Sequence, residues 1–285
     1  MTNTHAEDLH SGDRFAFGSN WANFLRLLND ARINEAEQSL KRMLSVESLF
    51  GKRVLDIGSG SGLFSLAARR LGATVHSFDY DPQSVACTQE LRRRNDPTDG
   101  GWTIESGSVL DKHYLRTLGS WDIVYSWGVL HHTGSMWEAL SNVAPLVAPG
   151  GLLFISIYND QGSMSAWWRS LKRTYNRLPR LLRAPYALIV LGPHEAMRFI
   201  GTTARSRDPR TYFRNILHYG ESSRRGMSYW HDLIDWIGGH PFEVATPEAI
   251  FDFYTANGFE LAKLKTCGGR LGCNEFVFRR SPAHA

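Results

Sequence analysis

Hydrophobic and polar positions along the middle of the chain follow a pattern of strands separated by helices. Short apolar segments bounded by glycine or polar residues, typical of buried strands, occur at 52–58, 73–79, 102–108, 121–128 and 151–158. Helical periodicity fills the intervals, at 63–72, 82–94, 111–119 and 136–147. Strands that are connected through helices lie parallel, so the pattern predicts a doubly wound α/β sheet.

The alternation stops after Tyr158. Residues 160–245 are rich in Arg, Trp and Pro, show no clear strand, and are predicted to form a helical insertion. A helix at 247–258 and two strands at 259–267 and 273–280 then follow, and the connecting GGRLG predicts an antiparallel hairpin. We therefore divide the chain into an N-terminal helical segment (1–50), a core (51–159), the insertion (160–245) and the completion of the sheet (246–285).

The first predicted strand leads into VLDIGSGSGLF, which places glycines at 58, 60 and 62. A dinucleotide loop of the GxGxxG type would need its third glycine at position 63, which is Leu63. Asp56 precedes the glycines, and a carboxylate here would repel a pyrophosphate but could accept hydrogen bonds from an ammonium group. The spacing therefore favours an adenosine ligand with a cationic tail over a nicotinamide or flavin dinucleotide.

This loop and four later segments together resemble the class I S-adenosylmethionine-dependent methyltransferases. The segments are the VHSFD that ends in Asp79, then GSVLD, WDIVYSWGVLHH and LVAPGGLLFIS. The resemblance covers about residues 50–160 and, by architecture, 246–280. It implies a seven-stranded, mostly parallel, Rossmann-like sheet with an antiparallel C-terminal hairpin and a helical insertion after strand five. It also implies S-adenosyl-L-methionine as the cofactor.

The resemblance assigns roles to particular residues. Asp79 lies where the family places the acid that binds the ribose hydroxyls, and Tyr80 where a side chain packs against adenine. Ser108 stands where many members carry an acid that holds the adenine amino group, and this is a departure from the family pattern. The predicted cofactor-binding residues are Asp56, Gly58, Ser59, Gly60, Gly62, Asp79, Tyr80, Ser108, Val109 and Trp127.

Two histidines, His131 and His132, directly follow the fourth predicted strand. An acceptor hydroxyl or ammonium must lose a proton during methyl transfer, and imidazole is a suitable base near neutral pH. Alternatively, one histidine caps the next helix or lines the cofactor pocket. His132 resembles the histidine of the Leu-Glu-His stretch in ubiquinone-pathway O-methyltransferases. His131 replaces the Glu of that stretch, which removes an acid that could bind a metal, and no metal site is predicted.

Two further catalytic candidates are Tyr158, at the end of strand five, and His231 in YWHDLIDWIGGHPFEV. On a helix His231 and Asp235 would be neighbours at i and i+4, able to form a pair. A polar turn at Tyr158, and core tryptophans with exposed charges in the later stretch, are the alternatives. Near the N-terminus, Phe15, Phe17 and Trp21 either form a lid over the cofactor or pack on the core.

Charge is distributed unevenly along the chain. Residues 160–230 contain 13 Lys and Arg against 4 Asp and Glu, whereas the remainder contains 19 against 24. Nucleic acid is disfavoured as the acceptor for two reasons. Ser126-Trp127-Gly128-Val129 stands where base-amino methyltransferases carry a (Asp/Asn/Ser)-Pro-Pro-(Tyr/Phe) stretch, and the segment directly after strand four lacks the nucleophilic cysteine that pyrimidine-carbon methyltransferases need. The aromatic and basic part of the insertion (160–230) could instead contact an anionic membrane surface, or the insertion could form a substrate cap.

We predict methyl transfer to an O or N atom of a small-molecule acceptor, such as a secondary metabolite. A lipid-linked or membrane-associated acceptor is the nearest alternative, followed by an RNA or protein acceptor and by a cofactor-binding scaffold without catalysis. Three cysteines without CxxC spacing, a polar N-terminus and no apolar run approaching about 20 residues predict a cytoplasmic protein. This protein could attach peripherally to a membrane, and the sequence leaves its oligomeric state open.

Overall fold

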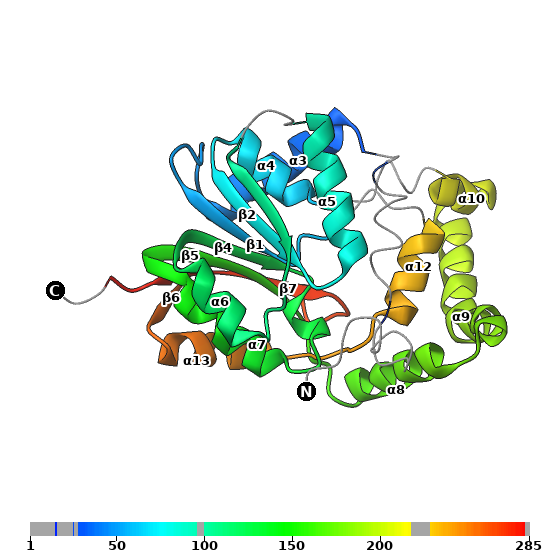
Figure 1. Ribbon diagram of the computed structural model, residues 1–285. Helices are drawn as coiled ribbons and strands as arrows, with labels where there is room; N and C mark the ends of the chain where they lie inside the picture. The colour runs from blue at the N-terminus through cyan, green and yellow to red at the C-terminus, as the bar shows by residue number, and fades with distance from the viewer. Residues whose placement is uncertain (1–14, 16–24, 26–27, 96–99, 218–228, 283–285) are drawn as a thin grey trace.

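A single mixed sheet organises the molecule (Figure 1). The structure is a computed structural model that describes Phe15, Leu25 and residues 28–95, 100–217 and 229–282. The strands are β1 (Arg53–Ile57), β2 (Thr74–Asp79), β3 (Trp102–Ser106), β4 (Trp121–Trp127), β5 (Val147–Tyr158), β6 (Phe259–Lys265) and β7 (Cys273–Arg280). Their order is β3-β2-β1-β4-β5-β7-β6. Strands β1 to β5 pair in parallel, and β7 runs antiparallel to both β5 and β6. The predicted seven-stranded fold is confirmed.

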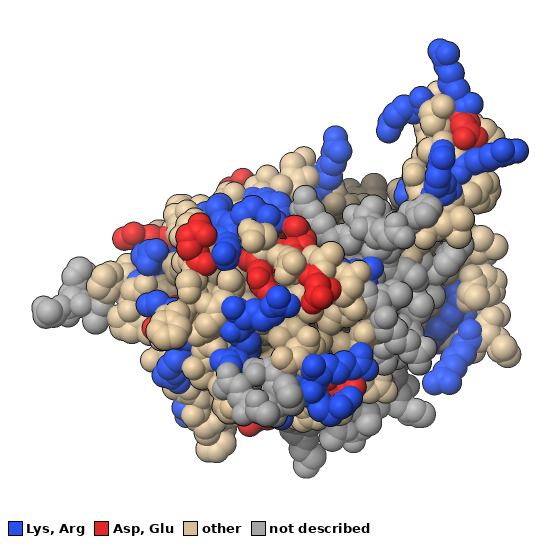
Figure 2. Space-filling model, turned by 90° about the horizontal axis from the view of Figure 1, so that it is seen from above, with Lys and Arg blue, Asp and Glu red and all other residues tan. Residues whose placement is uncertain are grey.

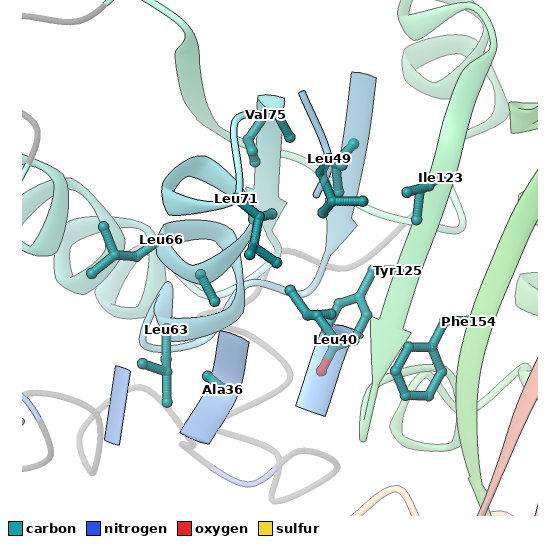
Figure 3. Packing of buried hydrophobic residues seen from close by; sticks show 14 of the residues in the cluster. Ala36, Leu40, Leu49, Leu63, Leu66, Leu71, Val75, Ile123, Tyr125 and Phe154 are labelled. Carbon is teal, nitrogen blue, oxygen red and sulfur yellow. The ribbon is translucent and has the colours of Figure 1, made fainter. Parts of the chain in front are cut away.

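Helices cover both faces of the sheet. The covering helices are α3 (Asp30–Leu44), α4 (Leu63–Arg70), α5 (Pro82–Asn95), α6 (Lys112–Leu118), α7 (Met136–Val143) and α13 (Pro247–Ala256). Side chains alternate along β1, so Val54 packs into the cluster under α3, α4 and α5, whereas Leu55 and Ile57 pack toward α6, α7 and α13. Figure 3 shows part of the first cluster, where Leu40 of α3 lies close to Tyr125 of β4. Burial on both faces explains why the strands read as nearly continuous apolar runs.

The largest difference from the predicted boundaries lies between α7 and β5. The helix expected at 136–147 ends at Val143, and a short 3-10 turn, η2 (Ala144–Leu146), replaces its last residues. Pro145 lies inside that turn and has no N–H group with which to continue an α-helix. Strand β5 consequently begins at Val147, four residues earlier than the apolar run suggested.

The insertion is helical, as predicted, and follows β5. It consists of α8 (Ser163–Arg177), α9 (Arg180–Ser206), α10 (Arg210–Leu217) and α12 (Tyr229–Gly238). These helices form a group beside the sheet and its covering helices (Figure 1). Phe15, Tyr175, Leu191 and Ile237 form a separate small core there.

The predicted N-terminal lid is described only at Phe15. Its backbone N–H donates to the His240 carbonyl at 2.9 Å, so this residue contacts the insertion. Phe17 and Trp21 lie outside the described residues. Helix α3 packs against the core with Ile33 and Leu40. Closure of residues 1–50 over a ligand stays a prediction.

Candidate active site

The glycine loop follows β1 and is fastened to the end of β2. The N–H groups of Gly58 and Ser59 both donate to the Phe78 carbonyl, at 2.8 and 3.2 Å. Gly58 has a φ of +77°, and a Cβ atom added to it would lie 2.4 Å from Cγ2 of Val129, in the segment after β4. Both the left-handed backbone and the close approach of Val129 require glycine at this position.

Asp79 ends β2 and faces this loop. Its Oδ2 accepts a hydrogen bond from the Gly60 N–H and its Oδ1 accepts one from the Asp81 N–H, each at 2.9 Å. Two backbone donors thus fix the orientation of the carboxylate at the mouth of the loop. Each carboxylate oxygen has two lone pairs, so Asp79 can accept further hydrogen bonds from a ligand.

Helix α5 supports the loop from the other side. The Ser59 hydroxyl lies 3.0 Å from the Thr88 hydroxyl, which also donates to the Gly60 carbonyl at 3.3 Å. Gly62 is the N-cap residue before α4, and a Cβ on it would lie 2.8 Å from Cγ2 of Thr88. The sequence analysis did not single out Thr88, because its position becomes meaningful only once α5 packs against the loop.

The remaining predicted cofactor residues lie at the same edge of the sheet, where β2, β3 and β4 end. Tyr80 and Trp127 are half-buried there. The Ser108 hydroxyl accepts from the Leu110 N–H at 3.2 Å. The side chain of Val109 is buried in the core, so an adenine contact at this residue would involve its backbone. Carboxyl ends of neighbouring parallel strands share one edge, and this edge is where doubly wound folds bind ligands.

Asp56 points into the protein. Its side chain is 3% exposed, and its Oδ2 accepts from the Ser65 hydroxyl at 2.5 Å. Ser65 in turn lies 2.7 Å from the Ser77 hydroxyl, which accepts from Trp102 Nε1 at 2.8 Å. Burial raises the pKa of Asp56 to about 7, against the opposing effect of the Ser65 hydrogen bond. The contact with a ligand ammonium, which the sequence suggested, stays a prediction.

This raised pKa predicts a pH-dependent stability. A carboxyl whose pKa is higher in the folded state than in the unfolded state binds more protons when folded, so the protein loses stability as pH rises from about 4 to about 7. The change Asp56→Asn keeps an acceptor for Ser65 but cannot ionise. We expect it to raise the free energy of unfolding more at pH 8 than at pH 5, by roughly 1–3 kcal/mol, since one pKa unit corresponds to about 1.4 kcal/mol.

Urea unfolding at pH 5, 6, 7 and 8 measures this difference. The control is Asp252→Asn, which removes an exposed carboxyl on α13. A variant at position 56 that is destabilised equally at all four values would show that the ionised carboxylate is tolerated without cost.

His132 lies in a 3-10 turn, η1 (Leu130–His132), directly after β4. Its Nδ1 is 2.6 Å from the Pro241 carbonyl oxygen. A carbonyl can only accept, so Nδ1 carries the proton, and in the neutral ring the lone pair lies on Nε2. This hydrogen bond therefore fixes both the orientation of the ring and the nitrogen that can take up a proton.

His131, His132, Tyr158 and Phe242 form a cluster of rings, here called the ring cluster. The His131 ring lies 4.1 Å from the Tyr158 ring and 4.5 Å from the His132 ring, between centroids. Tyr158 also contacts Phe242 at 5.1 Å. Three of the four predicted catalytic residues are thus brought together, at the ends of β4 and β5.

The fourth, His231, lies in α12, but its side chain and that of Asp235 are outside the described part of the structure. The proposed pairing of the two stays a prediction.

The chain that returns from the insertion lies directly on the histidine turn. The Glu243 N–H donates to the His131 carbonyl at 3.0 Å, and the Glu243 carboxylate accepts from the Met136 N–H at 3.0 and 3.1 Å. Pro241 belongs to the same segment. The sequence analysis did not name Pro241, Phe242 or Glu243, since contacts over more than a hundred residues leave no local pattern.

The sheet order, the glycine loop after β1 and the carboxylate at the end of β2 are the arrangement of class I S-adenosylmethionine-dependent methyltransferases. Residues 26–187, more than half of the chain, match the family model described as a methyltransferase domain. The chain belongs to this methyltransferase domain family.

Relatives and solved structures agree with the family. The ubiquinone biosynthesis O-methyltransferase of Escherichia coli O7:K1 is 30% identical over 157 residues, which are 53% of this chain and 58% of the relative. That of Shigella boydii serotype 18 is 29% identical over the same shares of the two chains. The chain thus spans less than two thirds of the relatives that it matches.

Two solved structures share the fold with a TM-score of 0.51 and 14% identity. Magnesium protoporphyrin IX methyltransferase from Synechocystis, with bound SAH, aligns over 99% of this chain and 89% of its own. The 1,6-didemethyltoxoflavin-N1-methyltransferase of Burkholderia thailandensis aligns over 99% and 92%.

The residues present fit S-adenosyl-L-methionine, the cofactor of this class. The loop offers backbone without side chains at 58, 60 and 62, and Asp79 is held as a hydrogen-bond acceptor beside it. Across the edge, a Cβ added at Gly128 would meet nothing within 4 Å, so there is open space at the end of β4. A ligand with ribose hydroxyls and an amino-acid tail matches this combination of donors, acceptor and space.

Proposed function

We propose that the protein transfers a methyl group from S-adenosyl-L-methionine to an O or N atom of a small-molecule acceptor. The observation that carries the proposal is the carboxylate of Asp79, oriented by Gly60 and Asp81 beside a loop that only glycine can form. Membership of the methyltransferase domain family supports the same reaction. The O-methyltransferase relatives favour oxygen as the acceptor atom.

When bound, S-adenosyl-L-methionine supplies a methyl group that is already activated by a sulfonium. The protein then has to align the acceptor, exclude water and, for a hydroxyl or ammonium acceptor, remove a proton. We assign proton removal to Nε2 of His132, because the Pro241 carbonyl holds the proton on Nδ1. His131 and Tyr158 would form the wall against which the acceptor rests. His231 stays a secondary candidate.

Calorimetric titration tests the cofactor assignment directly. The protein should bind S-adenosylhomocysteine and S-adenosylmethionine and should show no heat of binding with NADH. Tight binding of NADH without binding of either sulfur compound would overturn the proposal. Transfer of a tritiated methyl group to phenolic, carboxylic or amine acceptors then separates a catalyst from a cofactor-binding scaffold.

A lipid-linked or membrane-associated acceptor is the second candidate, and the outer face of α9 favours it. The exposed apolar residues of this helix are Leu181, Leu182, Leu188, Ile189, Met197 and Ile200. Leu188 and Ile189 are 73% and 74% exposed, in a segment where Arg greatly outnumbers acidic residues. Lys and Arg side chains, which are all Arg in these two helices, project on the side of the molecule where α9 and α10 lie (Figure 2). Exposed apolar residues with Arg around them suit an anionic lipid surface.

Attachment of this kind would be peripheral, since no helix among the described residues is long and apolar enough to cross a membrane. We expect the protein to float with vesicles that contain 30% anionic phosphatidylglycerol and to stay behind with pure phosphatidylcholine vesicles. The change Ile189→Glu should abolish flotation, whereas Leu264→Glu, at an exposed apolar residue of β6, should not. Absence of flotation with both vesicle types would leave the insertion as a cap over a soluble acceptor.

A further inference from the structure

A small cavity lies beyond the end of β5, between the sheet and the insertion. Its lining consists of Tyr158, Asn159, Trp168, Lys172, Trp236, Phe242, Leu271 and Gly272. The cavity volume is about 10 Å³, which is roughly the size of one water molecule. It can therefore take an end group of a ligand, but not a whole acceptor.

The cavity adjoins the ring cluster. Tyr158 and Phe242 belong to both, and their ring centroids are 5.1 Å apart. The other side of Tyr158 contacts His131 and His132, at 4.1 and 5.4 Å between centroids. Tyr158 therefore lies between the cavity and the two histidines and contacts both.

Trp168 is the residue of the lining that indicates a ligand. It is 8% exposed, and its Nε1 is buried without a hydrogen-bond partner. An indole N–H can only donate, and leaving a buried donor unsatisfied costs about 1–3 kcal/mol. Native structures rarely accept this cost without a reason, so an acceptor atom from outside the chain is the natural partner.

The other residues of the lining restrict the kind of molecule that can carry this hydrogen-bond acceptor. Lys172, 2% exposed, places an ammonium in the same lining, where it donates to the Trp236 carbonyl and lies 4.9 Å from the Phe242 ring centroid. The walls are aromatic, with Trp168 and Trp236 only 4.0 Å apart between centroids. The side-chain amide of Asn159 is used within the protein, because it donates to the Arg270 carbonyl and accepts from Asn274. Donors and flat walls suit an oxygen acceptor on a planar molecule.

From these contacts we infer that the methyl acceptor is a planar aromatic compound with a carbonyl or carboxylate oxygen, and that this oxygen accepts a hydrogen bond from Trp168 Nε1. This inference rests on the proposed function and names the substrate class of the same site. It explains why the insertion contributes a buried tryptophan and a lysine one helical turn apart, at 168 and 172. The oxygen would anchor one end of the acceptor while His132 stands near the reacting end.

The test compares three probes of nearly equal shape by calorimetry in the presence of saturating S-adenosylhomocysteine. They are 3-hydroxyacetophenone, which carries a neutral carbonyl, 3-hydroxybenzoate, which carries a carboxylate, and 3-ethylphenol, which has neither. We expect at least one oxygen-bearing probe to bind the wild-type protein 10-fold or more tightly than 3-ethylphenol. Preference for the benzoate would identify a carboxylate, and preference for the acetophenone a neutral carbonyl.

The change Trp168→Phe keeps a ring and removes the N–H group. It should bring the ratio of the affinity for the oxygen-bearing probe to the affinity for 3-ethylphenol close to one. The matched control is Trp167→Phe, because Trp167 is the adjacent tryptophan on α8 and is 51% exposed. The control should keep the preference. Equal binding of all three probes to the wild type, no measurable binding of any of them, or a preference that survives Trp168→Phe would each overturn the inference.

Titration with S-adenosylhomocysteine alone distinguishes failure of this inference from failure of the proposed function. If S-adenosylhomocysteine does not bind while the oxygen-bearing probes still bind through Trp168, the methyltransferase assignment fails and the pocket assignment stands.

Discussion

Replacing Asp79 by alanine is expected to weaken binding of S-adenosylhomocysteine by roughly 100-fold or more, because hydrogen bonds to a charged group contribute about 1.5–3 kcal/mol each. Asp79 accepts from Gly60 and from Asp81 in the structure, and these bonds fix its carboxylate at the edge where we propose that it binds the ribose hydroxyls. The alanine variant loses both the ligand contacts and the tie to the loop. Isothermal titration calorimetry measures the loss.

The more conservative change Asp79→Asn keeps one acceptor oxygen and should fall between the wild type and the alanine variant. The matched control is Asp208→Ala, since Asp208 also accepts from a backbone N–H, that of Arg210 at 2.9 Å, but lies in the insertion between α9 and α10. The control should bind the ligand as the wild type does. Unchanged affinity in Asp79→Ala, with the melting temperature preserved, would show that the ribose is held elsewhere.

The arrangement of the sheet edge where we propose that the cofactor binds could be predicted from the sequence, because its determinants are local. A glycine loop, a buried strand and an acid at a strand end each leave a short pattern, and the sheet then brings the ends of neighbouring strands together. The loop and the end of β2 meet in this way, because Gly58 donates to the Phe78 carbonyl and Gly60 donates to Asp79. The boundary at Pro145 could also have been predicted, since proline cannot continue the helix that precedes it.

Asp56 shows where the sequence reasoning was incomplete. Its position beside the glycines suggested a carboxylate facing a ligand, but it lies within β1, where alternate side chains point to opposite faces. Val54 and Asp56 share the face that packs under α4, and this places the carboxyl beside Ser65. Strand alternation alone could have indicated this interior position.

The acceptor side could not be derived from the sequence, because its contacts join segments far apart in the chain. His132 is oriented by Pro241, at a separation of 109 residues, and Lys172 donates to the carbonyl of Trp236. A helical pattern in the insertion says that Trp168 and Lys172 lie on one face, but not which surface that face covers. Only the packing of α8 and α12 at the end of β5 brings them near Tyr158.

His132→Phe is expected to lower the rate of methyl transfer by roughly 100-fold or more, the usual contribution of a general base, while leaving the affinity for S-adenosylhomocysteine nearly unchanged. Phenylalanine preserves a ring beside His131 and Tyr158 but cannot take up a proton. The measurement uses tritiated S-adenosylmethionine and the hydroxylated aromatic acceptor that gives the highest wild-type rate. The wild-type rate should rise with pH between 5 and 8 as the imidazole loses its proton, and the variant should lack this rise.

His131→Phe distinguishes the two histidines. The His131 ring is fully buried against Tyr158, so its replacement should alter acceptor affinity more than the pH dependence of the rate. Loss of the pH dependence in His131→Phe, with retention in His132→Phe, would transfer the role of base to His131. Equal rates and pH profiles in both variants and the wild type would mean that neither ring takes the proton, and His231 would then be the candidate to test. The Pro241 hydrogen bond favours His132, because it fixes which of the two ring nitrogens can act as the base.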